Sequence, residues 1–195
     1  MLCKDILLLA IGGLISLVTS ISLLWVQRKL DRSGDLLIFY RMLYPVSNTK
    51  KLYFEMNDEI IFNFQILFDL QNTSNSLKVM RDINILLYKD NKYVAKMKRN
   101  YSAVQKEGNK LIREDKFGNE QNSYSITIPP RGIQTLLFDF LYDIKQEEIQ
   151  KYDFNNIRLE YHDDKNKCHV LKMREIKNCW KEEYFENDID WILVK

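Results

Sequence analysis

The chain has 195 residues, of which 46% are hydrophobic and 12% aromatic, a composition typical of a folded protein that argues against disorder. The net charge of +2 resides in residues 1–32, so the remainder balances its acids and bases and has no net field that would draw it to nucleic acid. Residues 33–195 suffice for one domain with its own core.

An uncharged apolar segment, 6–27, follows a short tail, 1–5. Its sequence is ILLLAIGGLISLVTSISLLWVQ, which as a helix covers the roughly 30 Å of a bilayer core. A cleaved signal peptide would be shorter and would end in a small-x-small site, whereas this segment ends in Leu24-Trp25-Val26. We therefore expect a retained transmembrane helix and a lipid bilayer as partner.

A basic linker, 28–35, follows that helix. Trp25 falls where an interfacial aromatic belongs, and Arg28, Lys29 and Arg32 can meet anionic headgroups. Because more basic residues follow the helix than precede it, the soluble domain is expected in the cytoplasm, with the helix in the cell membrane.

Small residues recur along one face of the same helix. Gly12, Ser16 and Ser20 are spaced by four residues, which would let a second helix approach closely and form a homo-oligomer. Small residues are also common in membrane helices that do not associate, and the pattern is compatible with both interpretations.

The clearest strand signal runs over 59–71, where six apolar residues alternate with polar ones. A run of turn formers at 71–76 separates this strand from renewed alternation at 83–87, and we expect the two as antiparallel neighbours. The turn at 89–92 predicts a hairpin to a third strand, 93–97.

Further strands are expected at 124–128 and 136–140, separated by Pro129-Pro130-Arg131-Gly132, and at 157–161 and 168–174, which form a hairpin around 163–166. Residues 191–194 offer a last short strand, and only 143–152 is predicted to be helical. The pattern predicts an all-β, immunoglobulin-like antiparallel β-sandwich over 36–195. A long polar insertion at about 100–122 interrupts the sandwich. We expect this insertion to be a functional loop, a disordered segment or a mobile hairpin.

Two histidines, His162 and His169, flank a turn that also holds Asp163, Asp164 and Cys168. The spacing matches no metal motif, and turn aspartates are expected for backbone reasons, so we expect no metal and no cofactor. The three cysteines, Cys3, Cys168 and Cys179, favour reduced thiols, although a Cys168–Cys179 bridge becomes possible if the domain lies outside the cell.

Other polar motifs carry no recognisable chemistry. Carboxylate pairs occur at Asp188 and Asp190, at 147–148 and at 182–183, outside any catalytic frame. No catalytic serine, zinc-protease or phosphate-loop motif is present, so no catalytic residue is predicted. Sequons begin at Asn72 and Asn100 and fit turns without any sugar.

Three phrases carry a resemblance: GDLLIFY at 34–40, RDIN at 81–84 and DWIL at 190–193. Behind an N-terminal anchor, they resemble uncharacterised membrane-anchored proteins of AT-rich Gram-positive bacteria. The resemblance covers most of the chain and implies an architecture, with no activity, site or cofactor.

These observations favour a membrane-tethered, non-enzymatic binding or scaffolding module with a protein partner that the sequence does not identify. The alternative is a membrane effector whose soluble domain senses a ligand or partner and whose helix oligomerises through Gly12, Ser16 and Ser20. A hydrolytic enzyme is a third hypothesis.

Overall fold

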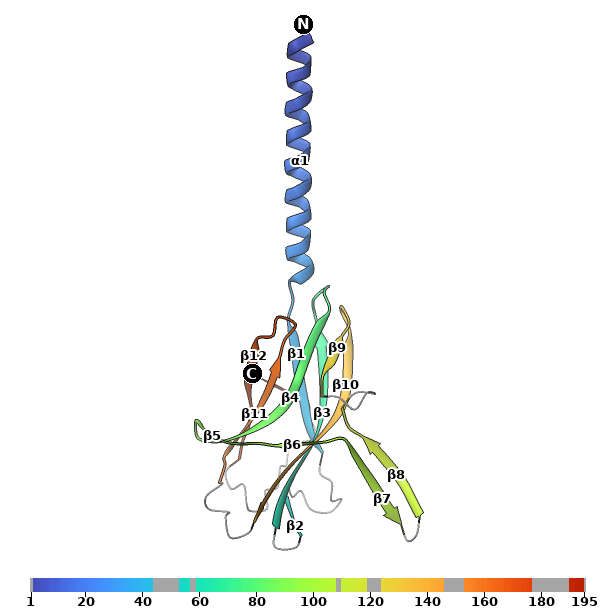
Figure 1. Ribbon diagram of the computed structural model, residues 1–195, viewed down its shortest axis with the longest axis vertical. Coiled ribbons are helices and arrows are strands. Elements are labelled where there is room, and N and C mark those ends of the chain that lie inside the picture. The colour runs from blue at the N-terminus through green and yellow to red at the C-terminus, as the bar shows by residue number, and fades with distance from the viewer. Residues whose placement is uncertain are drawn as a thin grey trace.

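The computed structural model describes residues 2–43, 53–56, 59–107, 110–118, 124–145, 153–176 and 190–194. One long helix, α1, extends away from a β-domain (Figure 1). The strands are β1 (Leu36–Leu43), β2 (Tyr53–Met56), β3 (Glu59–Asn72), β4 (Lys78–Lys89), β5 (Lys92–Lys96), β6 (Lys98–Asn100), β7 (Ser102–Glu107), β8 (Lys110–Lys116), β9 (Ile126–Ile128), β10 (Ile133–Lys145), β11 (Asn156–His162), β12 (Cys168–Glu175) and β13 (Ile192–Leu193).

Helix α1 spans Leu2–Arg32 and is the one helix in the described residues that is long and apolar enough to cross a membrane, judged by length and composition. Its apolar side chains from Leu9 to Leu30 are exposed and contact no part of the β-domain core. The helix is longer than the predicted segment 6–27 because it includes most of the predicted tail and continues into the predicted linker as far as Arg32.

The β-domain is an all-antiparallel sandwich, which confirms the predicted fold class. The first sheet has the order β13-β1-β3-β10-β6, with β2 also paired to β3, and the second has the order β12-β11-β4-β5, with β9 also paired to β4. Strand β3 is central, because β1 covers one edge and β10 pairs with it from Glu59 to Gln71 on the other.

One predicted pairing is wrong: β3 and β4 are not neighbours but lie in opposite sheets. The chain changes sheet in the turn at 72–77, where the buried Asn72 amide Nδ2 donates to the carbonyls of Ser76 (2.8 Å) and Pro129 (3.0 Å). Alternation identifies the buried face of a strand but not its partner, and for this reason the sequence pattern was compatible with a hairpin.

The core lies between the two sheets. Alternate side chains of β3 are at most 4% exposed, and they form one core cluster with buried residues of the neighbouring strand β10 and of β4 and β11 in the opposite sheet. Aromatic rings fill much of this space: Tyr124 lies 4.9 Å from Phe138 and 5.1 Å from Phe140 between ring centroids. The predicted strand and its buried face at 60–70 are therefore confirmed.

The predicted helix at 143–152 is wrong over its first three residues. Asp143, Ile144 and Lys145 end β10, and Ile144 pairs with Ile60 of β3. Its buried, apolar side chain belongs to the two-residue period of β10, which the surrounding charged residues obscured in the sequence. Residues 146–152 lie outside the described residues.

Two other predictions concern turns and the insertion. The hairpin turn at 89–92 is confirmed, with Asp90 at a φ of +54°, and the 163–166 hairpin is confirmed, with Asn166 at +63°. The polar insertion contains the antiparallel hairpin β7–β8, while its mobility and its function remain predictions. Residues 108–109 and 119–123 lie outside the described residues.

Hydrogen bonds between residues 31–35 and residues 73–75 connect helix α1 to the sandwich. We call this region the joint. The backbone N–H of Asn75 donates to the carbonyl of Asp31 (3.1 Å), and that of Thr73 donates to the carbonyl of Asp35 (3.0 Å). The Thr73 hydroxyl also accepts from the Asp35 N–H at 2.8 Å. Gly34 adopts a φ of +116°, and a Cβ there would lie 2.8 Å from the Ser74 backbone, so the close approach requires glycine.

Candidate functional site

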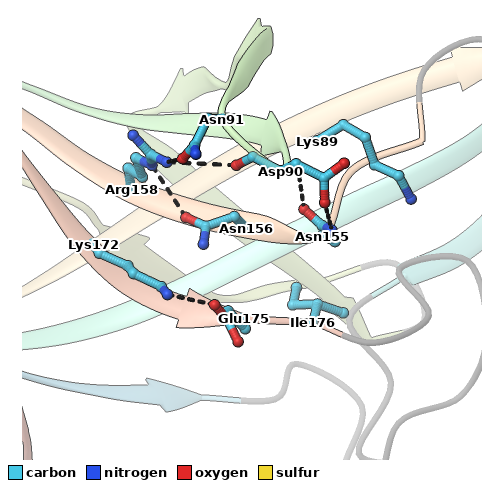
Figure 2. Close-up of a pocket in the computed structure, with 9 residues that line it drawn as sticks. All are labelled: Lys89, Asp90, Asn91, Asn155, Asn156, Arg158, Lys172, Glu175 and Ile176. Atoms are coloured by element: carbon cyan, nitrogen blue, oxygen red, sulfur yellow. Dashed lines mark hydrogen bonds and ion pairs between the residues drawn. The ribbon is translucent and has the colours of Figure 1, made fainter.

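A polar pocket of about 590 Å³ opens where the β4–β5 turn meets the start of β11 and the end of β12 (Figure 2). The residues around it are almost all charged or amide side chains: Lys89, Asp90, Asn91, Asn155, Asn156, Arg158, Lys172, Glu175 and Ile176. Strand β4 begins beside the joint and ends at the pocket, and twelve extended residues reach up to roughly 40 Å. The pocket therefore lies away from α1.

One wall of the pocket is a pair of reciprocal hydrogen bonds between Asp90 and Asn155. The Asp90 backbone N–H donates to Asn155 Oδ1 at 2.7 Å, and Asn155 Nδ2 donates to Asp90 Oδ1 at 2.9 Å. The backbone of Asn155 is held in turn, because its N–H donates to the Tyr88 carbonyl and its carbonyl accepts from the Ile176 N–H. These hydrogen bonds hold the hairpin turn beside the start of β11.

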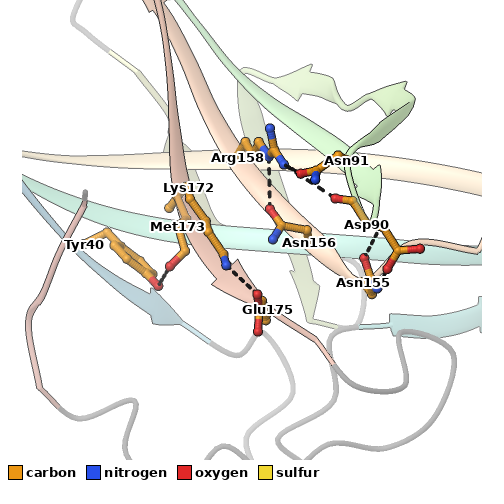
Figure 3. A network of polar contacts seen from close by, with 9 residues as sticks. All are labelled: Tyr40, Asp90, Asn91, Asn155, Asn156, Arg158, Lys172, Met173 and Glu175. Carbon is orange, nitrogen blue, oxygen red and sulfur yellow. Dashed lines mark hydrogen bonds and ion pairs between the residues drawn. The ribbon is translucent and has the colours of Figure 1, made fainter.

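Arg158 is a cation of the pocket whose side chain is held by several neighbours. Its guanidinium lies 4.0 Å from the Tyr88 ring centroid. It donates to Asn91 Oδ1 at 2.9 Å and to Asn156 Oδ1 at 3.2 Å (Figure 3). A register shift in the β11–β12 pairing falls between Ile157 and Arg158. Stacking on an aromatic ring and holding two amides reduces the number of orientations available to this side chain.

The opposite wall carries an ion pair between Lys172 and Glu175, which are both on β12. The Lys172 ammonium hydrogen-bonds the Glu175 carboxyl and lowers its pKa, so Glu175 is a carboxylate at neutral pH. Nearby, the Tyr40 hydroxyl of β1 donates to the Met173 carbonyl at 3.0 Å and ties β12 to the first sheet. The pocket thus combines hydrogen-bond donors and acceptors, an arrangement suited to hydrogen-bonding a polar ligand.

A second polar cluster is buried beside β10. The Asp139 side chain is 1% exposed, its Oδ2 accepts from Asn100 Nδ2 at 2.8 Å, and its Oδ1 has no partner among the described residues. Burial raises the pKa of Asp139 to about 6. The Tyr124 hydroxyl donates to the Asp139 carbonyl at 2.7 Å, and its pKa is also raised by burial. These hydrogen bonds join β6, β10 and Tyr124 inside the domain.

The predicted membrane-interface residues lie on the last turns of α1. Trp25 is exposed, and the Lys29 ammonium lies 5.6 Å from its ring centroid. Arg28 is on the same exposed stretch, and Arg32 is the last residue of the helix. An interfacial role for these residues remains a prediction.

The small residues Gly12, Ser16 and Ser20 are exposed along α1. The Ser20 hydroxyl donates to the Ser16 carbonyl at 2.8 Å, so it is satisfied within its own helix. A Cβ at Gly12 would meet nothing within 4 Å. The face is open to a second helix, and self-association remains a prediction.

The histidine turn is organised around Asp163. Its Oδ1 accepts from the backbone N–H groups of Lys165 and Lys167, and its Oδ2 lies 2.9 Å from His169 Nε2, which lowers the pKa of Asp163 to about 2. His162 does not join this group, and its Nδ1 is buried with no hydrogen-bond partner among the described residues. In the ranges described above, no cluster of three or more potential metal ligands occurs.

The remaining sequence motifs are placed as follows. Asn72 is 2% exposed and Asn100 bonds Asp139, so both sequon amides serve internal hydrogen bonds. Cys168 is an exposed free thiol, whereas Cys3 has no described side chain and Cys179 lies outside the described residues, as do 147–148, 182–183 and Asp188. Asp190 is exposed near β13.

Sequence reasoning missed the pocket residues. The turn at 89–92 was predicted, but nothing in the sequence indicates that Asn155 would pair with Asp90 across 65 positions. The available signal was the run Phe154-Asn155-Asn156 directly before a predicted strand, since amides at a strand start often bond neighbouring turns.

The fold and the pocket together define a class of protein: an antiparallel β-sandwich of the immunoglobulin-like type attached to one apolar helix, a type of domain that suggests binding or scaffolding. The chain belongs to the family of YopI Ig-like domains, whose model matches residues 43–174, about two thirds of the chain. No curated protein and no solved structure matches it. The match supports the sandwich and does not address the predicted resemblance to Gram-positive membrane proteins.

Proposed function

We propose that the protein is a membrane-tethered, non-enzymatic binding module. The observation that carries this proposal is the joint, which connects an immunoglobulin-like sandwich to a helix long and apolar enough to span a bilayer. In this arrangement α1, which extends from one end of the sandwich (Figure 1), holds the domain at the membrane. The polar pocket lies away from α1 and is the surface that meets a partner.

The chemistry of the pocket indicates the kind of partner. Arg158 and Lys172 supply positive charge, Glu175 supplies negative charge, and Asn91 and Asn156 supply amide groups. A charged or polar segment of a protein offers matching donors and acceptors, including carboxylates for the guanidinium fork of Arg158. We therefore propose a polar protein segment as the ligand.

Site-specific photocrosslinking in native membranes tests this proposal. A photoreactive phenylalanine analogue at Lys172, on the pocket rim, is expected to form a partner adduct. The same analogue at Val170, an exposed residue two positions earlier on β12 that does not line the pocket, is the matched control. Arg158→Ala should reduce the Lys172 adduct several-fold when both proteins are compared below the melting temperature of the variant, which loses the Tyr88 contact and two amide hydrogen bonds. Equal adducts at both positions, or none at Lys172, would contradict the proposal.

The second part of the proposal is orientation: we place residues 33–195 in the cytoplasm, on the basis of Arg28, Lys29, Arg32 and Arg41 after the helix. Protease added to intact cells should leave the domain uncut, whereas protease added after lysis should remove it. Complete digestion without lysis would reverse the orientation, and the Cys168–Cys179 bridge would then be worth testing.

The alternative function is a membrane effector, in which ligand binding to the domain drives assembly of α1 through Gly12, Ser16 and Ser20 and perturbs the bilayer. The joint favours this candidate as well, because its hydrogen bonds would transmit a movement of the sandwich to the helix. Purified full-length protein in dye-loaded liposomes separates the two functions. Leakage without any partner would reject a passive tether.

A further inference from the structure

The end of the sandwich that joins α1 exposes two large aliphatic side chains. Leu77 is 51% exposed and Ile133 is 65% exposed. Leu77 ends the turn at 72–77, and Ile133 follows the turn at 129–132; both turns point toward α1 (Figure 1). We call this surface, made by the two turns and Ile133, the proximal end.

Hydrogen bonds hold the proximal end beside the helix. The Arg131 backbone N–H donates to the Ser74 carbonyl (3.0 Å), and its Nε donates to Asn75 Oδ1 (2.8 Å), so the two turns are tied to one another. Asn75 is bonded in turn to the Asp31 carbonyl of α1. The distance of this end from a bilayer that α1 crosses is therefore set by the length of helix between them.

That length is short. From Gln27, the end of the predicted span, to Arg32 the helix rises only about 7–8 Å, at 1.5 Å per residue. The headgroup region of a bilayer extends about 5–8 Å beyond each side of the hydrocarbon core. The proximal end thus falls at the outer boundary of the headgroups, where the side chains of Leu77 and Ile133 can reach them.

The charge of the proximal end suits such a contact. The two turns and their flanks, 72–78 and 129–133, contain the cations Lys78 and Arg131 and no acid. The acids of the joint are Asp31 and Asp35, and they are outnumbered when Arg28, Lys29 and Arg32 are included. The β11–β12 turn at 163–167 lies at the same end and adds two aspartates and two lysines, so the net charge of this end stays positive. Aliphatic side chains beside cations are typical of protein segments at anionic membrane surfaces.

We propose that Leu77, Arg131 and Ile133 contact the lipid headgroups of the membrane that α1 crosses, so that the sandwich rests on the bilayer and does not swing freely. This inference rests on the proposed membrane tether. Its partner is lipid, since this surface is continuous with the membrane-spanning helix, and a protein covering the same end is the competing outcome of the test.

Fluorescence quenching in nanodiscs tests the contact. Full-length protein with Cys3, Cys168 and Cys179 replaced by serine receives one labelled cysteine, through Leu77→Cys, Ile133→Cys, Trp25→Cys or Tyr93→Cys. Tyr93 is the matched control, because it is 59% exposed and lies on β5, away from α1. The nanodiscs contain phosphatidylcholine with a headgroup nitroxide, with or without phosphatidylglycerol.

Labels at 77 and 133 should be quenched several-fold more than the label at 93, and more strongly with phosphatidylglycerol. Quenching at 25 alone would overturn the headgroup contact while leaving the tether intact. No quenching at 25 would show that α1 does not insert, which would overturn both proposals. Shielding of 77 and 133 from aqueous iodide without nitroxide quenching would assign this end to a protein partner and overturn the lipid contact.

Discussion

Phe64→Ala is expected to destabilise the domain by about 3–5 kcal/mol, because it removes a ring from the centre of the core and leaves a cavity. Phe64 is 0% exposed on β3 and stands directly opposite Phe140, which is also 0% exposed on β10. Such a loss is a large share of the 5–15 kcal/mol that stabilises a typical domain. Thermal unfolding of the full-length protein in detergent micelles measures it.

Asn63→Ala is the control for this prediction, one position away on the opposite face of β3. The Asn63 side chain is half-buried, and its Oδ1 has no hydrogen-bond partner in the described part of the chain. Removing it deletes no described side-chain bond, so the cost should stay under about 1 kcal/mol. Equal losses of stability in the two variants would mean that side chains on both faces of β3 pack into a core.

Asp139→Asn is expected to stabilise the protein at pH 7.5 and to remove a pH dependence. The folded pKa of about 6 exceeds the unfolded value near 4, so the folded state binds more protons between these values. The free energy of unfolding should therefore fall as the pH rises from 4 to above 6, by up to about 3 kcal/mol. Asparagine avoids the buried charge and keeps an acceptor for Asn100. Because the new amide N–H groups also need partners, we expect the free energy of unfolding at pH 7.5 to rise by only about 1–2 kcal/mol.

Melting temperatures at pH 4.5, 6 and 7.5 measure this effect. Asp163 does not interfere, because its pKa is lowered to about 2 and its contribution to stability is lost only below the unfolded value near 4. Asp69→Asn is the matched control: Asp69 lies on the outer face of β3 and accepts hydrogen bonds from Thr135 and Gln71. If Asp69→Asn raised the melting temperature as much as Asp139→Asn does, burial of the Asp139 carboxylate would not be the cause of the stabilisation.

The sequence predicts most strands of this fold because their local signals are strong. The alternation at 60–70 and the turns at 89–92 and 163–166 depend on neighbouring residues alone, and the structure confirms each. The assignment of β3 and β4 to one sheet failed because partner choice depends on the whole core. In the same way, Ile144 belongs to a strand only because Ile60 lies opposite.

The candidate site was less predictable than the fold. The sequence predicts Trp25, Arg28 and Lys29 at a membrane boundary, because such a boundary has a linear signature, and this role remains a prediction. The polar pocket does not, because Asp90 and Arg158 come together only when β4 and β11 pair. Likewise, the raised pKa of Asp139 follows from its burial, and nothing near it in the sequence indicates this.

The position of β1 between β3 and β13 has a consequence for how the protein is made. Phe39 of β1 pairs with Leu193, so the first sheet is completed only after the last described strand has been synthesised. Helix α1 precedes every described strand and therefore leaves the ribosome before them. Pairings between distant segments raise the contact order, and such domains fold in milliseconds to seconds. If α1 inserts during synthesis, the sandwich completes its folding with one end already anchored.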